Sequence, residues 1–177
     1  MTKKNKLAGF LSVILRIIYI ISLVAMVALG IASVVMFFAV PLEGVLNRIP
    51  GFSLNLSDFV MSDFVDVAKA FITTIMFVVV SRCLMVVLQT ISDGTPFESD
   101  NADRFSIIAK VVVYAEIAKV AIVPFSGLIA LLLDIEYGDG GAISLNLTNF
   151  LGAGIALVLA EVFREGARLR EEQELTV

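Results

Sequence analysis

Long apolar runs separated by short polar stretches dominate the chain. A helix needs about 20 mostly apolar residues to cross the hydrocarbon core of a bilayer. Four segments have this character, at about residues 13–40, 64–91, 106–133 and 149–168. The pattern predicts an all-α membrane protein, a single domain over residues 1–177 built as a four-helix transmembrane bundle. The first run is longer than the apolar core of a signal peptide, so we expect it to remain as a span.

Basic residues are unevenly distributed among the polar stretches. They occur in the N-terminal segment, the 92–105 connection and the 164–177 tail, as Lys3, Lys4, Lys6, Arg16, Arg104, Arg164, Arg168 and Arg170. The 41–66 connection contains only Arg48, and the 134–149 connection contains none. Because basic flanks stay on the cytoplasmic side, we predict a multi-pass protein of the cytoplasmic membrane. Both termini and the 92–105 connection would then be cytoplasmic.

Composition supports this class of protein and limits the kinds of functional site that the chain can contain. Hydrophobic residues make up 59% of the 177 residues and charged residues only 17%, which leaves too little polar cover for a soluble domain. With no histidine and a single cysteine, Cys83, the usual zinc and haem sites are disfavoured and no internal disulfide is possible. The net charge of −4 argues against direct nucleic-acid binding. We therefore expect no enzymatic activity, no cofactor and no metal site.

A seven-residue pattern occurs twice, as SLNLSDF at residues 53–59 and SLNLTNF at residues 144–150. Each copy precedes a span that would return to the cytoplasm. We interpret the chain as two helical hairpins in parallel orientation, with the SLNL segments paired as a short two-stranded β-ribbon outside the membrane. Ser57 and Thr148 would then cap the following helices. A chance resemblance between two segments that begin helices is the alternative.

The ionisable residues inside the predicted spans include Arg82, Glu116 and Lys119. Arg82 and Glu116 each lie about ten residues from the 92–105 connection, so antiparallel neighbours would place them at the same depth. We predict an intramembrane ion pair between them, shared with Lys119. Such a group can orient helices, form part of an ion pathway, or consist of side chains that separately reach the membrane surface.

Small residues recur at helical spacing in the first and last spans. They are Ala25, Ala28, Ala32, Gly152, Ala156 and Ala160. Such stripes allow close approach between helices, either within the bundle or between copies in a homo-oligomer.

Two motifs carry a family resemblance. The sequence GTPF followed by NADR within residues 94–104, together with the ending LAEVFREGARLREEQELTV, resembles domain-of-unknown-function family 2975. In layout the resemblance extends over nearly the whole chain. It implies a small bacterial membrane protein with four spans. Because such proteins are often encoded beside small helix-turn-helix regulators, it also implies a membrane partner for a regulator of that kind. The family has no established catalytic residues.

Together these features indicate a regulatory or sensing protein that binds a cytoplasmic helix-turn-helix regulator. The charged tail beside the 92–105 connection provides the predicted contact residues, which are Phe97, Asn101, Arg104, Arg164, Arg168 and Arg170. The alternative is a small transporter, channel, or efflux or immunity protein, which would depend on the charges within the spans instead.

Overall fold

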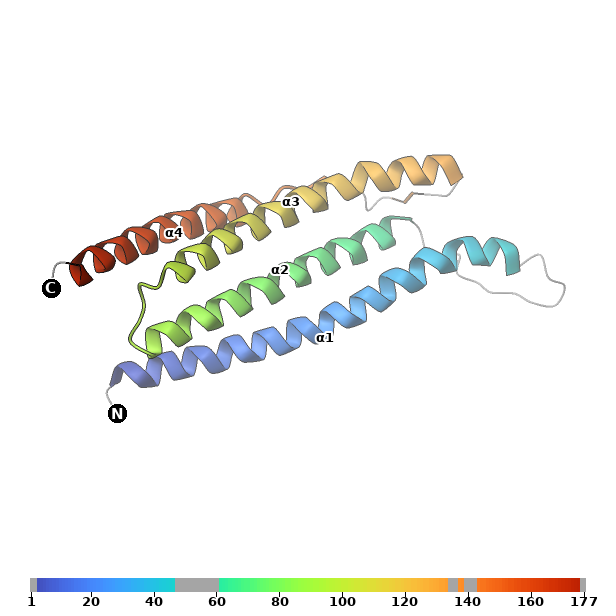
Figure 1. Ribbon diagram of the computed structural model, residues 1–177. Coiled ribbons are helices and arrows are strands. Elements are labelled where there is room, and N and C mark those ends of the chain that lie inside the picture. The colour runs from blue at the N-terminus through green and yellow to red at the C-terminus, as the bar shows by residue number, and fades with distance from the viewer. Residues whose placement is uncertain (1–2, 47–60, 134–136, 139–142, 176–177) are drawn as a thin grey trace. The chain divides into compact units, whose positions relative to one another are not determined.

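The computed structural model describes residues 3–46, 61–133, 137–138 and 143–175. These residues form four helices, α1 (Lys3–Leu46), α2 (Met61–Ser92), α3 (Ser99–Leu133) and α4 (Leu147–Glu174) (Figure 1). The all-α prediction is confirmed for the part of the chain that is described.

All four helices contain stretches long and apolar enough to cross a membrane: Gly9–Phe38, Ser62–Ser92, Ser99–Leu132 and Leu147–Gln173. The four predicted spans are therefore confirmed as membrane-type helices. The main difference from the prediction is the connection between the second and third spans. Helix α3 already begins at Ser99, so the connection consists of a turn at residues 93–98. This turn is much shorter than the predicted 92–105 connection.

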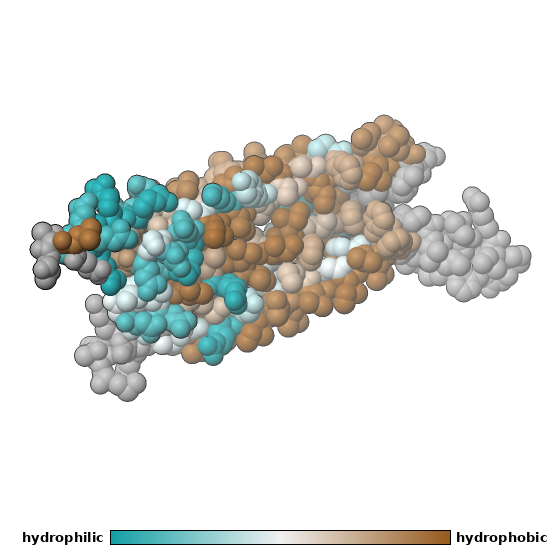
Figure 2. Space-filling view, viewed as in Figure 1, coloured by the Kyte–Doolittle hydropathy of each residue, from teal (hydrophilic) through white to brown (hydrophobic). Residues whose placement is uncertain are grey.

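Large apolar side chains remain exposed along these helices, as expected where lipid rather than protein covers them. Phe10 on α1 is 65% exposed and Leu151 on α4 is 67% exposed. In Figure 2 hydrophobic residues cover most of the visible helix surface, and hydrophilic residues gather toward the end of α4. The chain is thus built to contact a bilayer along its helices.

The chain divides into two compact units. The first unit contains Met1–Leu23, Ile75–Glu116 and Asn146–Val177, and the second contains Val24–Thr74 and Ile117–Leu145. The motifs that resemble the family lie in the first unit.

Helices in the first unit pack as antiparallel neighbours. The Phe105 ring near the start of α3 lies 5.1 Å from the Phe163 ring on α4, whereas Glu116, further along α3, bonds Asn149 at the start of α4. Helices α2 and α3 are joined by the short turn. The start of α1 and the end of α2 line one cleft. The beginning of α1, the turn and the end of α4 therefore share one end of this unit.

Small residues of α4 explain its close packing. Ala153, Ala156, Ala160 and Ala167 are all buried, with at most 7% exposure. Gly152 is exposed, and a β-carbon there would meet no atom within 4 Å. The inward stripe therefore begins at Ala153 instead of the predicted Gly152. It serves packing inside the unit, and self-association stays a prediction.

The second unit is held by polar and aromatic contacts at the start of α2. The Ser62 amide donates to the Tyr137 carbonyl at 2.9 Å, and the Tyr137 hydroxyl bonds the Ser126 hydroxyl of α3 at 3.1 Å. The Phe37 and Phe64 rings are 6.3 Å apart. These contacts join α1, α2 and α3 within the second unit.

A glycine on α1 allows a further close contact in this unit. A β-carbon on Gly30 would lie 3.3 Å from the Phe71 ring of α2. Residue 30 must therefore be small for α1 to lie this close to α2.

The predicted β-ribbon and caps are not supported. Residues 53–59, including Ser57, lie outside the described residues. In the second copy, residues 143–146 form no strand and Leu147 already begins α4. The N-cap is Asn146, whose side chain accepts from the Thr148 amide at 3.1 Å. The Thr148 prediction was wrong because Asn is at least as good a cap and lies two residues earlier, which places Thr148 inside the first turn.

Candidate partner-binding surface

The turn at residues 93–98 begins with a specific helix ending. The Thr95 amide donates to the Thr90 carbonyl at 3.0 Å, and the Gly94 amide donates to the Ile91 carbonyl at 3.3 Å. This pair of bonds is a Schellman motif, which needs a left-handed residue after the helix. Gly94 meets that need with a φ of 83°. The glycine of the GTPF motif is thus required by the backbone.

Asn101 fastens the turn to the end of α2. Its side-chain amide donates to the Thr90 hydroxyl at 2.7 Å and to the Pro96 carbonyl at 2.9 Å. Its carbonyl oxygen accepts from Arg104 Nη1 at 2.8 Å. The side chain is fully buried. Asn101 was expected at the contact surface, but in this structure it holds the turn from inside.

Arg104 supports the same arrangement. Its second guanidinium nitrogen lies 3.4 Å from the Asp100 carboxylate, and its side chain is 23% exposed. The guanidinium is therefore largely engaged by Asn101 and Asp100. Arg104 presents less free positive charge at the surface than the sequence indicates.

Aromatic rings join the turn to α4. The Phe97 and Phe163 ring centroids are 5.8 Å apart, and Phe163 also contacts Phe105. Opposite the Phe97 ring lies Gly166, where an added β-carbon would stand only 2.7 Å from Phe97 Cε1. No other residue fits at position 166 without moving the ring. We call Phe97, Phe105, Phe163 and Gly166 the turn–tail junction.

A groove of about 350 Å³ lies beside the junction. It is lined by residues of the turn, the start of α3 and the tail: Phe97, Glu98, Ser99, Asp100, Ala167, Arg170 and Glu171. Phe97 is 44% exposed. The groove therefore offers an apolar ring between basic and acidic side chains, an arrangement suited to a protein segment of mixed character.

Charged side chains continue along the outer face of α4. Arg164 pairs with Glu161 at 2.5 Å, and Arg168 pairs with Glu165 at 2.7 Å and with Glu172 at 3.6 Å. These arginine side chains are 54% and 64% exposed. Exposed pairs of this kind contribute little to stability, so they can exchange their partners for those of another protein.

Of the predicted contact residues, Phe97 and Arg170 meet at the groove, and Arg164 and Arg168 lie exposed along α4. The sequence analysis missed Phe105, Phe163 and Gly166. Its available signal was a phenylalanine and a glycine three residues apart in the charged stretch VFREGAR, a combination that solvent-facing helices rarely need.

The ionisable residues predicted inside the spans differ in their exposure to solvent. Glu116 is 1% exposed and accepts a hydrogen bond from Asn149 at 2.5 Å, a partner that the sequence analysis did not identify. Lys119 follows on α3 and is half-buried, while Arg82 is exposed on α2. The ion pair between Arg82 and Glu116 stays a prediction, since no ion pair of Arg82 is found among the described residues. Within the described residues, no three Cys, Asp or Glu side chains are grouped as a metal site would require.

Comparison with known proteins places the chain in a family. The sequence model of DUF2975, described as a protein of unknown function, matches residues 67–177. The chain belongs to this family. The DUF2975 match includes the turn and the tail, whereas α1 lies outside it, so the resemblance covers less of the chain than its layout indicated. No curated protein and no solved structure matches the chain.

Proposed function

We propose that this DUF2975 member is a non-enzymatic membrane protein that binds a cytoplasmic helix-turn-helix regulator and holds it at the membrane. The observation that carries the proposal is the fit between Phe97 and Gly166. It fixes the turn against the tail, so that the two family motifs form one surface. A purely solvated tail needs no such fit.

The chemistry of this surface defines what it would recognise. A partner would place an apolar side chain against Phe97 in the groove and direct carboxylates toward the arginines of α4. Arginine forms two parallel hydrogen bonds to a carboxylate. Such bonds would replace the existing pairs with Glu161 and Glu165. Release of the partner would follow from a rearrangement of the spans around Arg82 and Glu116.

The proposal is tested by cross-linking in the native host and recovery of bound proteins. The triple variant R164E/R168E/R170E reverses the charge and leaves the junction intact. The triple R164K/R168K/R170K is the matched control, because it keeps the charge but loses the forked geometry. We expect a small DNA-binding protein with the wild-type chain, less with the lysine variant and none with the glutamate variant. Equal recovery of the regulator with all three chains would exclude this surface as its binding site.

Truncation after Phe163 is a poor test, because it removes Gly166 and thus dismantles the junction. A cut after Leu169 keeps Gly166 and Ala167 while removing Arg170 and Glu171 from the groove. We expect this shorter chain to insert normally and to recover less regulator than the full chain.

One observation favours transport as a second candidate function. Glu116 is a buried carboxyl group in an apolar helix, and such groups often mark substrate or proton pathways. If the protein is a transporter, E116Q would abolish flux and the tail variants would have little effect. If it holds a regulator, the tail variants would be the damaging ones.

A further inference from the structure

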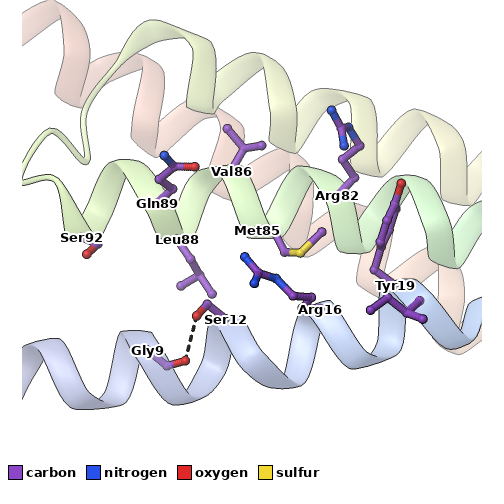
Figure 3. Close-up of a pocket in the computed structure, with 11 residues that line it drawn as sticks. Gly9, Ser12, Arg16, Tyr19, Arg82, Met85, Val86, Leu88, Gln89 and Ser92 are labelled. Carbon is purple, nitrogen blue, oxygen red and sulfur yellow. Dashed lines mark hydrogen bonds between the residues drawn. The ribbon is translucent and has the colours of Figure 1, made fainter.

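The first unit contains a cleft of about 780 Å³ between the start of α1 and the end of α2 (Figure 3). The polar lining residues recur along each helix at intervals of three, four or seven positions, which keeps each set on one side of its helix. They are Ser12, Arg16 and Tyr19 on α1 and Arg82, Gln89 and Ser92 on α2. Figure 3 shows Arg16 and Tyr19 extending from α1 toward α2. Two polar stripes thus line one cleft in otherwise apolar helices.

Neither arginine of the cleft has a charged or hydrogen-bonding partner in the part of the chain that the structure describes. Arg16 and Arg82 are exposed, and among those residues neither donates a hydrogen bond or joins an ion pair. The described residues that line the cleft include no acidic side chain. Since cations within a span are costly without a counter-charge, this arrangement is suited to an anion supplied from outside the protein.

The cleft begins at one end of the membrane-type stretches of α1 and α2. The membrane-type stretches of α1 and α2 are 30 and 31 residues long. At 1.5 Å per residue each is about 45 Å, whereas the hydrocarbon core is about 30 Å thick. The excess of about 15 Å is shared between the two head-group layers. Arg16 and Arg82 lie 7 and 10 residues, or about 10 and 15 Å, from the ends at Gly9 and Ser92. Their long side chains therefore reach the head groups by extending along the helices.

Apolar residues complete the lining. Ile20 on α1 and Val86 and Leu88 on α2 line the same cleft, with Met85 between them. The site therefore combines two cations and several hydrogen-bond donors with an apolar wall. This combination fits an amphiphile with a negatively charged head group, whereas a fully solvated ion would leave the apolar wall unused.

We propose that this cleft binds an anionic phospholipid. The phosphate binds Arg16, because a guanidinium group matches phosphate oxygens with forked hydrogen bonds. Arg82, whose side chain points away from α1 in Figure 3, adds a second positive charge to the lining. The Tyr19 hydroxyl supplies a further donor, and an acyl chain follows Ile20 and Leu88. The lipid would thereby tie α1 to the part of the chain that belongs to the family match.

A tryptophan reporter tests the site in lipid nanodiscs. The chain has no tryptophan, so Leu88→Trp introduces a single fluorophore inside the cleft. Ile17→Trp is the matched control, since Ile17 adjoins Arg16 but is 52% exposed and does not line the cleft. The nanodiscs contain phosphatidylcholine with a minor share of phosphatidylglycerol. Two preparations are compared: in one the phosphatidylglycerol carries bromine-labelled acyl chains, and in the other the phosphatidylcholine carries them.

We expect brominated phosphatidylglycerol to quench the Leu88→Trp reporter more strongly than brominated phosphatidylcholine at equal content. The Ile17→Trp control should show no preference between the two lipids. Adding Arg16→Gln or Arg82→Gln to the reporter should each weaken its preference about fivefold, the factor expected for one basic residue at an anionic surface. Equal quenching of the reporter by both lipids, or a preference that survives the double arginine variant, would overturn the proposal.

A second measurement keeps the test valid if the Leu88→Trp substitution disturbs the cleft. Native mass spectrometry of the unmodified chain should show retained phosphatidylglycerol that R16Q/R82Q loses. The same measurement is compared with a second one, in which inorganic phosphate is added to the chain in lipid-free detergent and its thermal stability is measured. Stabilisation of the chain by phosphate alone, dependent on both arginines, would assign the site to a soluble anion and exclude the lipid.

Discussion

The side-chain amide of Asn101 makes three hydrogen bonds within the protein, two as donor and one as acceptor. Only a short amide combines these roles at this distance from the backbone. Its partner Thr90 lies near the end of α2, and its partner Pro96 lies within the turn. One residue therefore holds the end of α2, the turn and the start of α3 together.

We predict that Asn101→Asp destabilises the first unit, because a carboxylate cannot donate to the Thr90 hydroxyl or the Pro96 carbonyl. Loss of partners for buried polar groups costs roughly 1–3 kcal/mol for each group. Cys83 is the only cysteine and is half-buried, so its maleimide reactivity on heating reports unfolding in detergent. The midpoint temperature should fall by several degrees, an effect typical of such a loss.

Asp103→Asn is the control for this change. Asp103 is exposed one residue before Arg104, and the substitution likewise interconverts an amide and a carboxylate. Its midpoint should remain that of the wild-type chain. If Asn101→Asp were to melt at the same temperature as Asp103→Asn, the three hydrogen bonds would not hold the turn.

At the scale of an element, α4 contacts the turn because position 166 carries no side chain. Gly166 leaves space that the Phe97 ring occupies, so a helical position that normally disfavours glycine gains a contact with the turn. We predict that Gly166→Ala displaces Phe97 and lowers stability, whereas Gly152→Ala does not, because open space surrounds that position. The alanine substitution at position 152 should even stabilise α4 by up to about 1 kcal/mol.

A double-mutant cycle shows whether Phe97 causes the loss. Phe97→Ala removes the ring, so adding Gly166→Ala to it should cost little further stability. The two changes should therefore be non-additive by about 0.5–3 kcal/mol, as for residues in direct contact. Maleimide labelling of Cys83 on heating again provides the readout. Additive effects would mean that position 166 acts through the helix alone.

Elements of this fold were predictable because hydropathy is a local property of the chain. The four spans followed from runs of apolar residues, and only their ends moved, as at Ser99 and Leu147. The cap at Thr148 failed because a competing residue, Asn146, lay two positions earlier. Choices between neighbouring polar residues depend on small free-energy differences, which a sequence pattern does not rank.

Contacts between elements were less predictable. Asn149 bonds Glu116 across 33 positions in the sequence, and no spacing rule relates the two. Asn101 was assigned to the surface because it is polar and lies near a turn, yet three internal partners keep it buried. Arg16 was interpreted only as an orientation signal, although its face of α1 meets a matching face of α2.

At the scale of the whole molecule, the distribution of charge predicts the orientation in the membrane. The antiparallel packing places the turn and the end of α4 at the same end of the first unit. This agrees with the prediction that both lie on the same side of the membrane. The basic residues predict that this side faces the cytoplasm. Both the proposed regulator surface and the proposed lipid site would then face the inner leaflet.

Cysteine accessibility tests this orientation. In a chain with Cys83 replaced by alanine, single cysteines replace exposed residues at Asp93 in the turn, Glu172 near the end of α4 and Ile143 before α4. A membrane-impermeant maleimide should label Ile143→Cys in intact spheroplasts, and the other two only in inverted vesicles, because α4 is long enough to separate its ends across a bilayer. Labelling of Glu172→Cys in spheroplasts would contradict the cytoplasmic tail. Labelling of Asp93→Cys and Glu172→Cys from opposite sides would contradict the junction between turn and tail, because Phe97 and Gly166 could not then meet.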